Sequence, residues 1–142
     1  MEFRRATQKD LDYVRQNPFE GAVKDYPYMQ IPDENCITTI FESHIVAVAG
    51  LVMKWPGVGE LWMMLTADCK KHGFFGLFAL TAIQEKMEWL IEANKLWRVQ
   101  AIVRLDFPQA IKMIEYFGFK RDCKMEKYLP DKTDAYLYSR IV

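Results

Sequence analysis

Apolar positions along the chain follow two different periods, and the changes of period predict where strands and helices lie. Near-continuous apolar runs over 37–41, 45–53 and 60–66 predict three strands of the kind that is covered on both faces. Apolar residues at helical spacing, opposite a row of glutamates, predict a long amphipathic helix over about 74–94. This succession predicts a sheet with a long helix packed across it.

Capping residues predict two shorter helices. Thr7, followed three residues later by Asp10, is typical of a helix N-terminus, and this helix is expected to end before Pro18. Asp106 is placed to cap the second helix, and Gly118 is typical of a helix C-terminal stop.

Further strands are predicted at 2–6, 97–103, 119–128 and 135–141. The complete order of elements predicts a mixed α/β fold that forms one domain over residues 1–142. A crossover through the long helix links the strand before it to the strand after it, which makes those two strands parallel. A ligand is therefore expected near the carboxyl ends of these strands.

The charge balance narrows the choice of partners. The chain carries 19 lysines and arginines against 19 aspartates and glutamates, so its formal net charge is zero. Such a chain has no global field with which to wrap nucleic acid or to anchor on an anionic membrane. No apolar segment approaches the roughly 20 residues of a membrane span, and residues 1–5 do not resemble a signal peptide. We expect a cytoplasmic protein with neither nucleic acid nor membrane as a partner.

The cysteines and histidines predict no metal site. Cys36, Cys69 and Cys123 are odd in number and far apart, which favours ordinary, partly buried thiols in a reducing compartment. A zinc site would require them to converge with His44 and His72 from separate segments, and the spacing does not favour this. His44 is expected to be exposed at the tip of a hairpin.

The tryptophans are not interleaved with basic residues, so we expect them in the core or at a subunit contact rather than on a base-stacking surface. Exposed aromatic residues would favour a homodimer. The tryptophans are Trp55, Trp62, Trp89 and Trp97.

Residues 65–76 are the stretch most informative about chemistry. They comprise a strand end, a turn with cations and two glycines, and the start of the long helix. A helix N-terminus offers unpaired N–H groups and a partial positive charge, so this turn can receive a pyrophosphate, with Lys70, Lys71 or His72 adding charge. It lacks the Gly-Lys-Ser/Thr sequence of a P-loop. An ordinary strand-to-helix turn with solvated lysines is the alternative.

Several segments, in order along nearly the whole chain, carry a family resemblance. Residues 70–75 read Lys-Lys-His-Gly-Phe-Phe, and residues 107–119 contain Ala-Ile and end on Gly-Phe. Residues 127–138 contain Lys-Tyr, then Pro-Asp, and then a second strand, and residues 5–10 form a strand-to-helix opening. Together these segments resemble the GNAT (GCN5-related N-acetyltransferase) superfamily, whose acetyl-CoA loop is a Gln/Arg-x-x-Gly-x-Gly/Ala run after the fourth strand.

The resemblance implies a GNAT-like acyl-CoA N-acyltransferase fold, acetyl-CoA as co-substrate and a primary amine as acceptor. Backbone groups of residues 63–65 would pair with the pantetheine arm, and residues 70–76 would hold the pyrophosphate. The family often places a carboxylate base where Glu60 stands, although a solvated carboxylate beside a glycine turn is the alternative. The residues assigned to acetyl-CoA are Met63, Met64, Leu65, Lys70, Lys71, His72, Gly73, Phe74, Phe75 and Gly76.

Two positions depart from the family pattern. Phe75 replaces the second small residue of the acetyl-CoA loop, and Ile114 stands where the family usually carries a tyrosine acid. Tyr116 lies roughly 200° further around that helix and cannot replace it. Tyr128 or a water molecule would then supply the proton to the departing thiolate.

These departures keep a second function open. Degenerate acetyl-CoA loops and a closing hairpin of this kind also resemble GNAT-like proteins of bacteriophages and prophages, some of which serve as virion or assembly components. The alternative is therefore a catalytically weak or inactive protein-binding module. Acceptor specificity is expected in residues 17–35 and in the closing hairpin, neither of which selects one amine class.

Overall fold

The computed structural model describes residues 1–19, 34–71 and 77–142. Within this part of the chain, one sheet has the strand order β1-β2-β3-β4-β5-β7-β6, and β4 and β5 are its parallel neighbours. The strands are β1 (Glu2–Arg5), β2 (Ile37–Phe41), β3 (His44–Trp55), β4 (Val58–Leu65), β5 (Arg98–Arg104), β6 (Lys120–Met125) and β7 (Ala135–Ile141). The helices are α1 (Gln8–Gln16), α2 (Asp68–Lys71), α3 (Leu77–Ala93) and α4 (Pro108–Tyr116).

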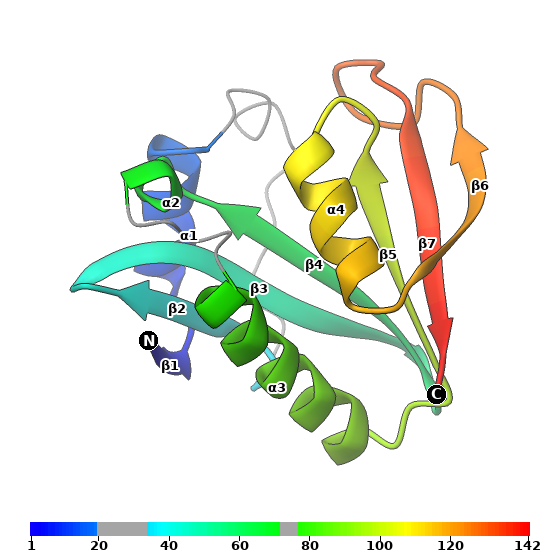
Figure 1. The fold of residues 1–142 in the computed structure, drawn as a ribbon, viewed down its shortest axis with the longest axis horizontal. Helices are drawn as coiled ribbons and strands as arrows, with labels where there is room; N and C mark the ends of the chain where they lie inside the picture. Colours follow the sequence, from blue (N-terminus) through cyan, green and yellow to red (C-terminus); the bar gives the residue numbers. More distant parts are fainter. Residues whose placement is uncertain (20–33, 72–76) are drawn as a thin grey trace.

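Helices cover the sheet on both faces. Figure 1 shows α3 and α4 in front of the sheet and α1 behind it. The larger core cluster joins α3 and α4 to β3, β4 and β5, and includes Ile83, Met113 and Leu65. The smaller cluster joins α1 to the opposite face, through Leu11 and Met64 among others. Because Met64 and Leu65 are neighbours in one strand, they point to opposite faces, which explains the continuous apolar runs in the sequence.

The predicted mixed α/β fold and its order of strands are confirmed. The capping box at the start of α1 is also confirmed, since the Asp10 amide donates to the Thr7 hydroxyl and the Asp10 carboxylate accepts from the Thr7 amide. Gly118 follows α4 with a φ of +86°, a conformation that favours glycine, as its predicted role as a stop requires.

One helix prediction is wrong, and another is confirmed over its described residues. Asp106 does not cap α4, because the N-cap is Phe107 and it makes no side-chain capping bond. The Asp106 carboxylate instead accepts a 2.9 Å hydrogen bond from Arg104. A hydrogen bond from a charged guanidinium is stronger than one from a neutral helix amide, which explains why Asp106 does not cap the helix. The long helix predicted over about residues 74–94 is present as α3 from Leu77 to Ala93, and residues 74–76 lie outside the described residues.

Most of the tryptophans are not core residues. Trp55, Trp89 and Trp97 are more than half exposed, which contradicts the core prediction and leaves a subunit contact as a prediction for them. Trp62 is partly buried and packs beside the α1 cluster. No helix among the described residues is long and apolar enough to cross a membrane.

The predicted burial of the cysteines is confirmed for two of the three. Cys36 and Cys69 are buried, whereas Cys123 is exposed on β6. In the described part of the chain, no group of three or more cysteine, histidine or acidic residues is placed to hold a metal ion. His44 is exposed at the β2–β3 turn, where its Nδ1 lies 2.8 Å from the Glu42 carbonyl oxygen.

Candidate functional site

The strands β4 and β5 separate along their length. They pair in parallel from Val58 opposite Arg98 to Leu61 opposite Ala101, and the pairing stops there. Beyond Leu61, β4 stays paired with β3 as far as Leu65. Figure 1 shows the two strands diverging toward their carboxyl ends. The edge of β4 from Trp62 to Leu65 therefore presents backbone groups that β5 does not bond.

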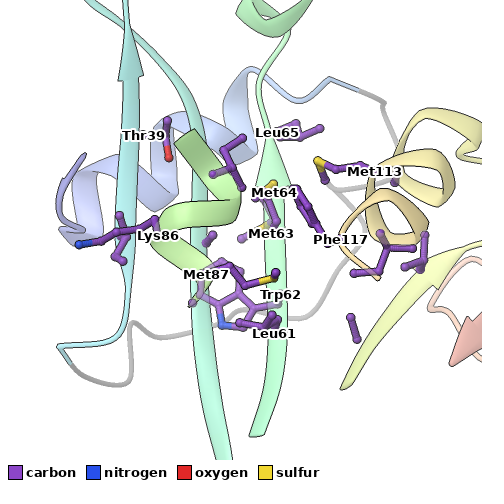
Figure 2. A pocket seen from close by; sticks show the side chains of 18 of the residues that line it. Thr39, Leu61, Trp62, Met63, Met64, Leu65, Lys86, Met87, Met113 and Phe117 are labelled. Carbon is purple, nitrogen blue, oxygen red and sulfur yellow. The ribbon is translucent and has the colours of Figure 1, made fainter. Parts of the chain in front are cut away.

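A cavity of about 250 Å³ lies at this divergence. Figure 2 shows β4 running through its centre, with Met113 and Phe117 of α4 on one side and Met87 of α3 on the other. We call the part beside β5 the α4 side; it is lined by Ala101, Val103, Phe107, Ala110, Met113, Ile114 and Phe117. We call the part beneath α3 the α3 side; it is lined by Phe3, Ile37, Thr39, Ala49, Ile83 and Met87.

The cavity walls are almost entirely apolar. Among the described residues that line it, the polar side chains are Thr39, Lys86 and Arg104. None of these lining residues is a histidine, cysteine, tyrosine or carboxylate. Acid or base groups would therefore have to act from the rim of the cavity or through water.

On α4, the residue that faces the cavity at the family's tyrosine position is Ile114. It is buried and lines the α4 side. Tyr116 is 47% exposed and is not among the lining residues, as its position around the helix predicts. The helix therefore presents no hydroxyl to the cavity at this point.

Two aromatic rings from distant segments line the end of the cavity nearest Lys70, which we call its mouth. Phe19 and Phe107 stack with their ring centroids 5.2 Å apart, and the Lys70 ammonium lies 4.6 Å from the Phe19 centroid. The Phe19 amide donates a 2.9 Å hydrogen bond to the carbonyl of Leu65. Residues 17–19 thus bond to the end of β4 beyond the point where β5 has left it.

Gly50 and Trp62 shape the opposite surface of β4. They are directly opposite each other on β3 and β4. A Cβ atom at Gly50 would lie 2.7 Å from the indole nitrogen of Trp62, so the absence of a side chain lets the ring lie flat against β3.

Glu60 lies on β4 within the paired region, before the strands separate. Its Oε1 accepts a 3.0 Å hydrogen bond from Gln100 Nε2, and its Oε2 lies 3.6 Å from Lys54 Nζ. Its side chain is 24% exposed. These two neighbours hold the carboxylate in one orientation on the α1 face of the sheet, next to the cavity residue Leu61.

Tyr128 lies in the connection between β6 and β7 and is 53% exposed. This connection is tied to the end of β5, since Arg104 Nη2 lies 2.7 Å from Asp131 Oδ2. Glu60 is opposite Gln100, four residues before Arg104, which places it roughly 13 Å back along the strand. The structure does not bring Glu60 and Tyr128 together.

The assigned acetyl-CoA residues fall into three groups. Met63, Met64 and Leu65 line the cavity on β4. Lys70 is exposed at the mouth, and Lys71 is the last residue of α2. His72, Gly73, Phe74, Phe75 and Gly76 lie outside the described residues.

Cys69, beside the mouth, is a structural residue. Its thiol donates a hydrogen bond to the carbonyl of Val46, and burial raises the pKa of the thiol to about 12. A thiol with such a high pKa holds almost no thiolate at neutral pH and is a poor nucleophile. The adjacent Asp68 accepts a 2.8 Å hydrogen bond from the Tyr13 hydroxyl, which raises the pKa of that hydroxyl and fastens α2 to α1.

Sequence reasoning missed several residues of the cavity. The aromatic residues of 17–35, Phe19 among them, predict a packed loop that could form a substrate wall, but nothing local in the sequence indicates the stacking of Phe19 on Phe107. The sequence does contain a pattern that points to Arg104. It is a charged residue at the end of a predicted strand, and an acidic residue that can bind it, Asp106, follows two positions later. Its position at the cavity, bonded to Asp131, depends on the closing hairpin.

Comparison with known proteins identifies the fold. No protein-family model matches the chain, and no curated protein matches it. Ard1 from Thermoplasma volcanium is 17% identical with a TM-score of 0.74, over 99% of this chain and 97% of that one. A GNAT-family acetyltransferase from Bacillus anthracis is 17% identical with a TM-score of 0.70, over 98% and 93%. Spermidine N-acetyltransferase from Vibrio cholerae, in complex with CoA and spermine, is 13% identical with a TM-score of 0.71, over 99% and 94%. The chain has the fold of the GNAT acyl-CoA N-acyltransferases.

Proposed function

We propose that this protein is an acyl-CoA-dependent N-acetyltransferase that transfers the acetyl group of acetyl-CoA to a primary amine. The observation that carries the proposal is the edge of β4 from Trp62 to Leu65, which β5 leaves unpaired beside an apolar cavity. The GNAT fold supports it, because the solved structures from Bacillus anthracis and Vibrio cholerae named above are acetyltransferases.

The residues present fit acetyl-CoA. The pantetheine arm contains amide groups and short apolar segments, so it can bond to a free strand edge while its carbons contact the cavity walls. Met63, Met64 and Leu65 lie along that edge beyond the last residue paired with β5, and the Leu65 carbonyl already accepts a hydrogen bond from the Phe19 amide. The Lys70 ammonium at the mouth would add charge for the pyrophosphate, together with residues 71–76.

The chemistry requires one proton to leave the acceptor amine. In the proposed reaction the amine nitrogen attacks the thioester carbonyl, a C–N bond forms, the C–S bond breaks and CoA leaves as a thiolate. Glu60 is the proposed base, because Lys54 and Gln100 keep its carboxylate oriented and it precedes the first cavity residue of β4. Tyr128 or water would return a proton to the thiolate.

The alternative, a catalytically weak or inactive binding or assembly module, is favoured by one observation. The described cavity lining contains no acid or base apart from the cations Lys86 and Arg104, and α4 presents Ile114 to it. A thiolate is a good leaving group, so transfer does not require an acid at Ile114. The resemblance to bacteriophage proteins, the cytoplasmic location and a homodimer remain proposals, the last supported by exposed Trp55 and Trp97.

The first experiment is acetyl-CoA binding by calorimetry, followed by release of free CoA across a panel of amines and peptides. Binding with turnover supports the enzyme, and binding without turnover on any amine supports the binding module. Absence of binding at millimolar acetyl-CoA would contradict the proposal.

The proposed acid and base are tested by matched substitutions. Glu60→Gln is expected to lower kcat, whereas Glu92→Gln, which changes an exposed glutamate of α3, is the control. Tyr128→Phe is compared with Tyr116→Phe, which lies outside the cavity lining. Full activity in Glu60→Gln would exclude Glu60 as the base.

A further inference from the structure

We propose that this protein transfers, in addition to acetyl, straight hydrocarbon acyl groups longer than acetyl, which it binds more tightly, and that their chain lies in the α3 side of the cavity. The inference rests on the proposed function and specifies its donor substrate. It is carried by the extent, the lining and the position of the cavity.

The cavity continues well beyond the place where a thioester would lie. Starting from the free edge of β4, it extends beneath α3 across β3 and β2 to Phe3 on β1. The sheet register places Met63, Ala49 and Ile37 side by side in one row across β4, β3 and β2. Since neighbouring strands lie about 4.8 Å apart, the distance from β4 to β1 is roughly 14 Å. An acetyl group would use only the first part of this length.

Small side chains on β3 create the space. Ala47 and Ala49 point toward α3 between the larger residues of β2 and β4, in rows that include Leu65 and Met63. Ala49 lines the cavity, and among the described residues Ile83 and Met87 leave a gap between it and the helix. Figure 2 shows Met87 above this part of the sheet.

The chemistry of this part suits a hydrocarbon and not a charged or strongly polar group. Lys86 contributes its aliphatic stem, while its ammonium lies 4.1 Å from the ring centroid of Trp89, an exposed residue on the outer side of α3. Thr39 is then the one polar side chain among the described lining residues of the α3 side. Methionines at 63 and 87 are flexible enough to pack around a chain of variable length.

The transfer itself is the same as for acetyl. The amine nitrogen forms a bond to the acyl carbonyl carbon, the C–S bond breaks, the amine proton passes to the base, and CoA leaves as a thiolate. No oxidant or further reactant is needed.

The experiment is a chain-length series. Dissociation constants of acetyl-, butyryl-, hexanoyl- and octanoyl-CoA are measured by calorimetry, and kcat/KM is measured with an amine that accepts acetyl. Each methylene that enters an apolar cavity is expected to tighten binding about fourfold until the cavity is full. Octanoyl-CoA should therefore bind at least about a hundredfold more tightly than acetyl-CoA.

A matched pair of variants locates the chain. Ala49→Ile fills the α3 side with a residue suited to a strand and should lower the preference for octanoyl over acetyl at least about tenfold. Ala110→Leu narrows the α4 side and should weaken all members of the series alike. Ala93→Ile adds the same side chain at an exposed position of α3 and should change nothing. The melting temperature of each variant shows whether it is folded, and a series on the unmodified protein in which affinity does not rise with length overturns the inference even where a variant is unfolded.

The outcomes separate this inference from the proposed function. If acetyl-CoA binds and reacts while longer chains bind equally or more weakly, the inference is overturned and the acetyltransferase stands. If affinity rises with length but Ala49→Ile leaves the preference unchanged, the chain lies elsewhere and the inference is overturned. If no acyl-CoA binds, both the proposed acetyltransferase function and this inference are overturned.

Discussion

The ion pair of Asp10 with Arg4 fixes α1, the helix that leads to Phe19 at the mouth of the cavity. Two short hydrogen bonds of 2.6 and 2.8 Å join Arg4 to the Asp10 carboxylate, which also accepts from the Thr7 amide and from the Thr38 hydroxyl. Burial of Asp10 opposes its ionisation, but these donors outweigh burial and lower the pKa from 3.8 to about 2.

The lowered pKa of Asp10 predicts that part of the free energy of unfolding depends on pH. Because the pKa of Asp10 is lower in the folded chain, this share is fully present above the unfolded value of 3.8 and is lost as pH falls from about 4 to about 2. A difference of nearly two pKa units corresponds to about 2 kcal/mol at neutral pH. At pH 2.5 less than half of that should remain.

Asp10→Asn tests this share directly. We expect the variant to lose about 2–3 kcal/mol of unfolding free energy at pH 7, because the amide cannot accept the paired bonds from Arg4. Urea denaturation at pH 7 and pH 2.5 gives the difference from the unmodified protein, and Asp12→Asn, on the exposed side of the same helix, is the control. A loss below about 0.5 kcal/mol at pH 7, or a loss that persists undiminished at pH 2.5, would refute the reasoning.

Three further predictions concern the surroundings of the cavity. Arg104→Met should raise the pKa of Asp131 from about 2 toward its ordinary value, because the hydrogen bond from Arg104 is what lowers it; an NMR titration of Asp131 measures the change. Iodoacetamide at pH 8 should label the exposed Cys123 and spare Cys69, whose pKa burial raises to about 12; mass spectrometry of the tryptic peptides would contradict this if Cys69 were labelled equally. Gly50→Val should displace the Trp62 ring and cost about 1–3 kcal/mol in urea denaturation, and an unchanged midpoint would contradict the close packing.

The order of strands and helices could be predicted because it follows from burial along the chain. Strands such as β3 and β4 are apolar on both faces, since α1 covers one face and α3 covers the other. Thr7 and Asp10 form a local capping box that needs no distant partner. Where a distant partner competes, the local rule fails, as at Asp106, whose carboxylate binds Arg104 instead of the helix N-terminus.

The cavity could not be predicted in the same way. After β4 has separated from β5, residues 17–19 bond to its end in place of β5. Pairing of this kind is decided by tertiary contacts such as the Phe19 stack on Phe107, and the periodicity of either segment does not contain it. Assignment of Met63, Met64 and Leu65 came from the family resemblance, and the structure places all three at the cavity.

The positions of the polar groups bear on what catalysis by this chain would require. In the proposed function the described cavity lining would hold the acyl donor by the edge of β4 and by apolar walls, and it offers no side-chain acid or base apart from Lys86 and Arg104. Arg104 is not available for an anionic substrate on its own, because the carboxylates of Asp106 and Asp131 both bind it. Rate enhancement would then come chiefly from holding the thioester in place and from excluding water, with the acceptor amine deprotonated at the rim. Such an enzyme would select its donor by shape, and the unfilled space beneath α3 is where that selection would be made.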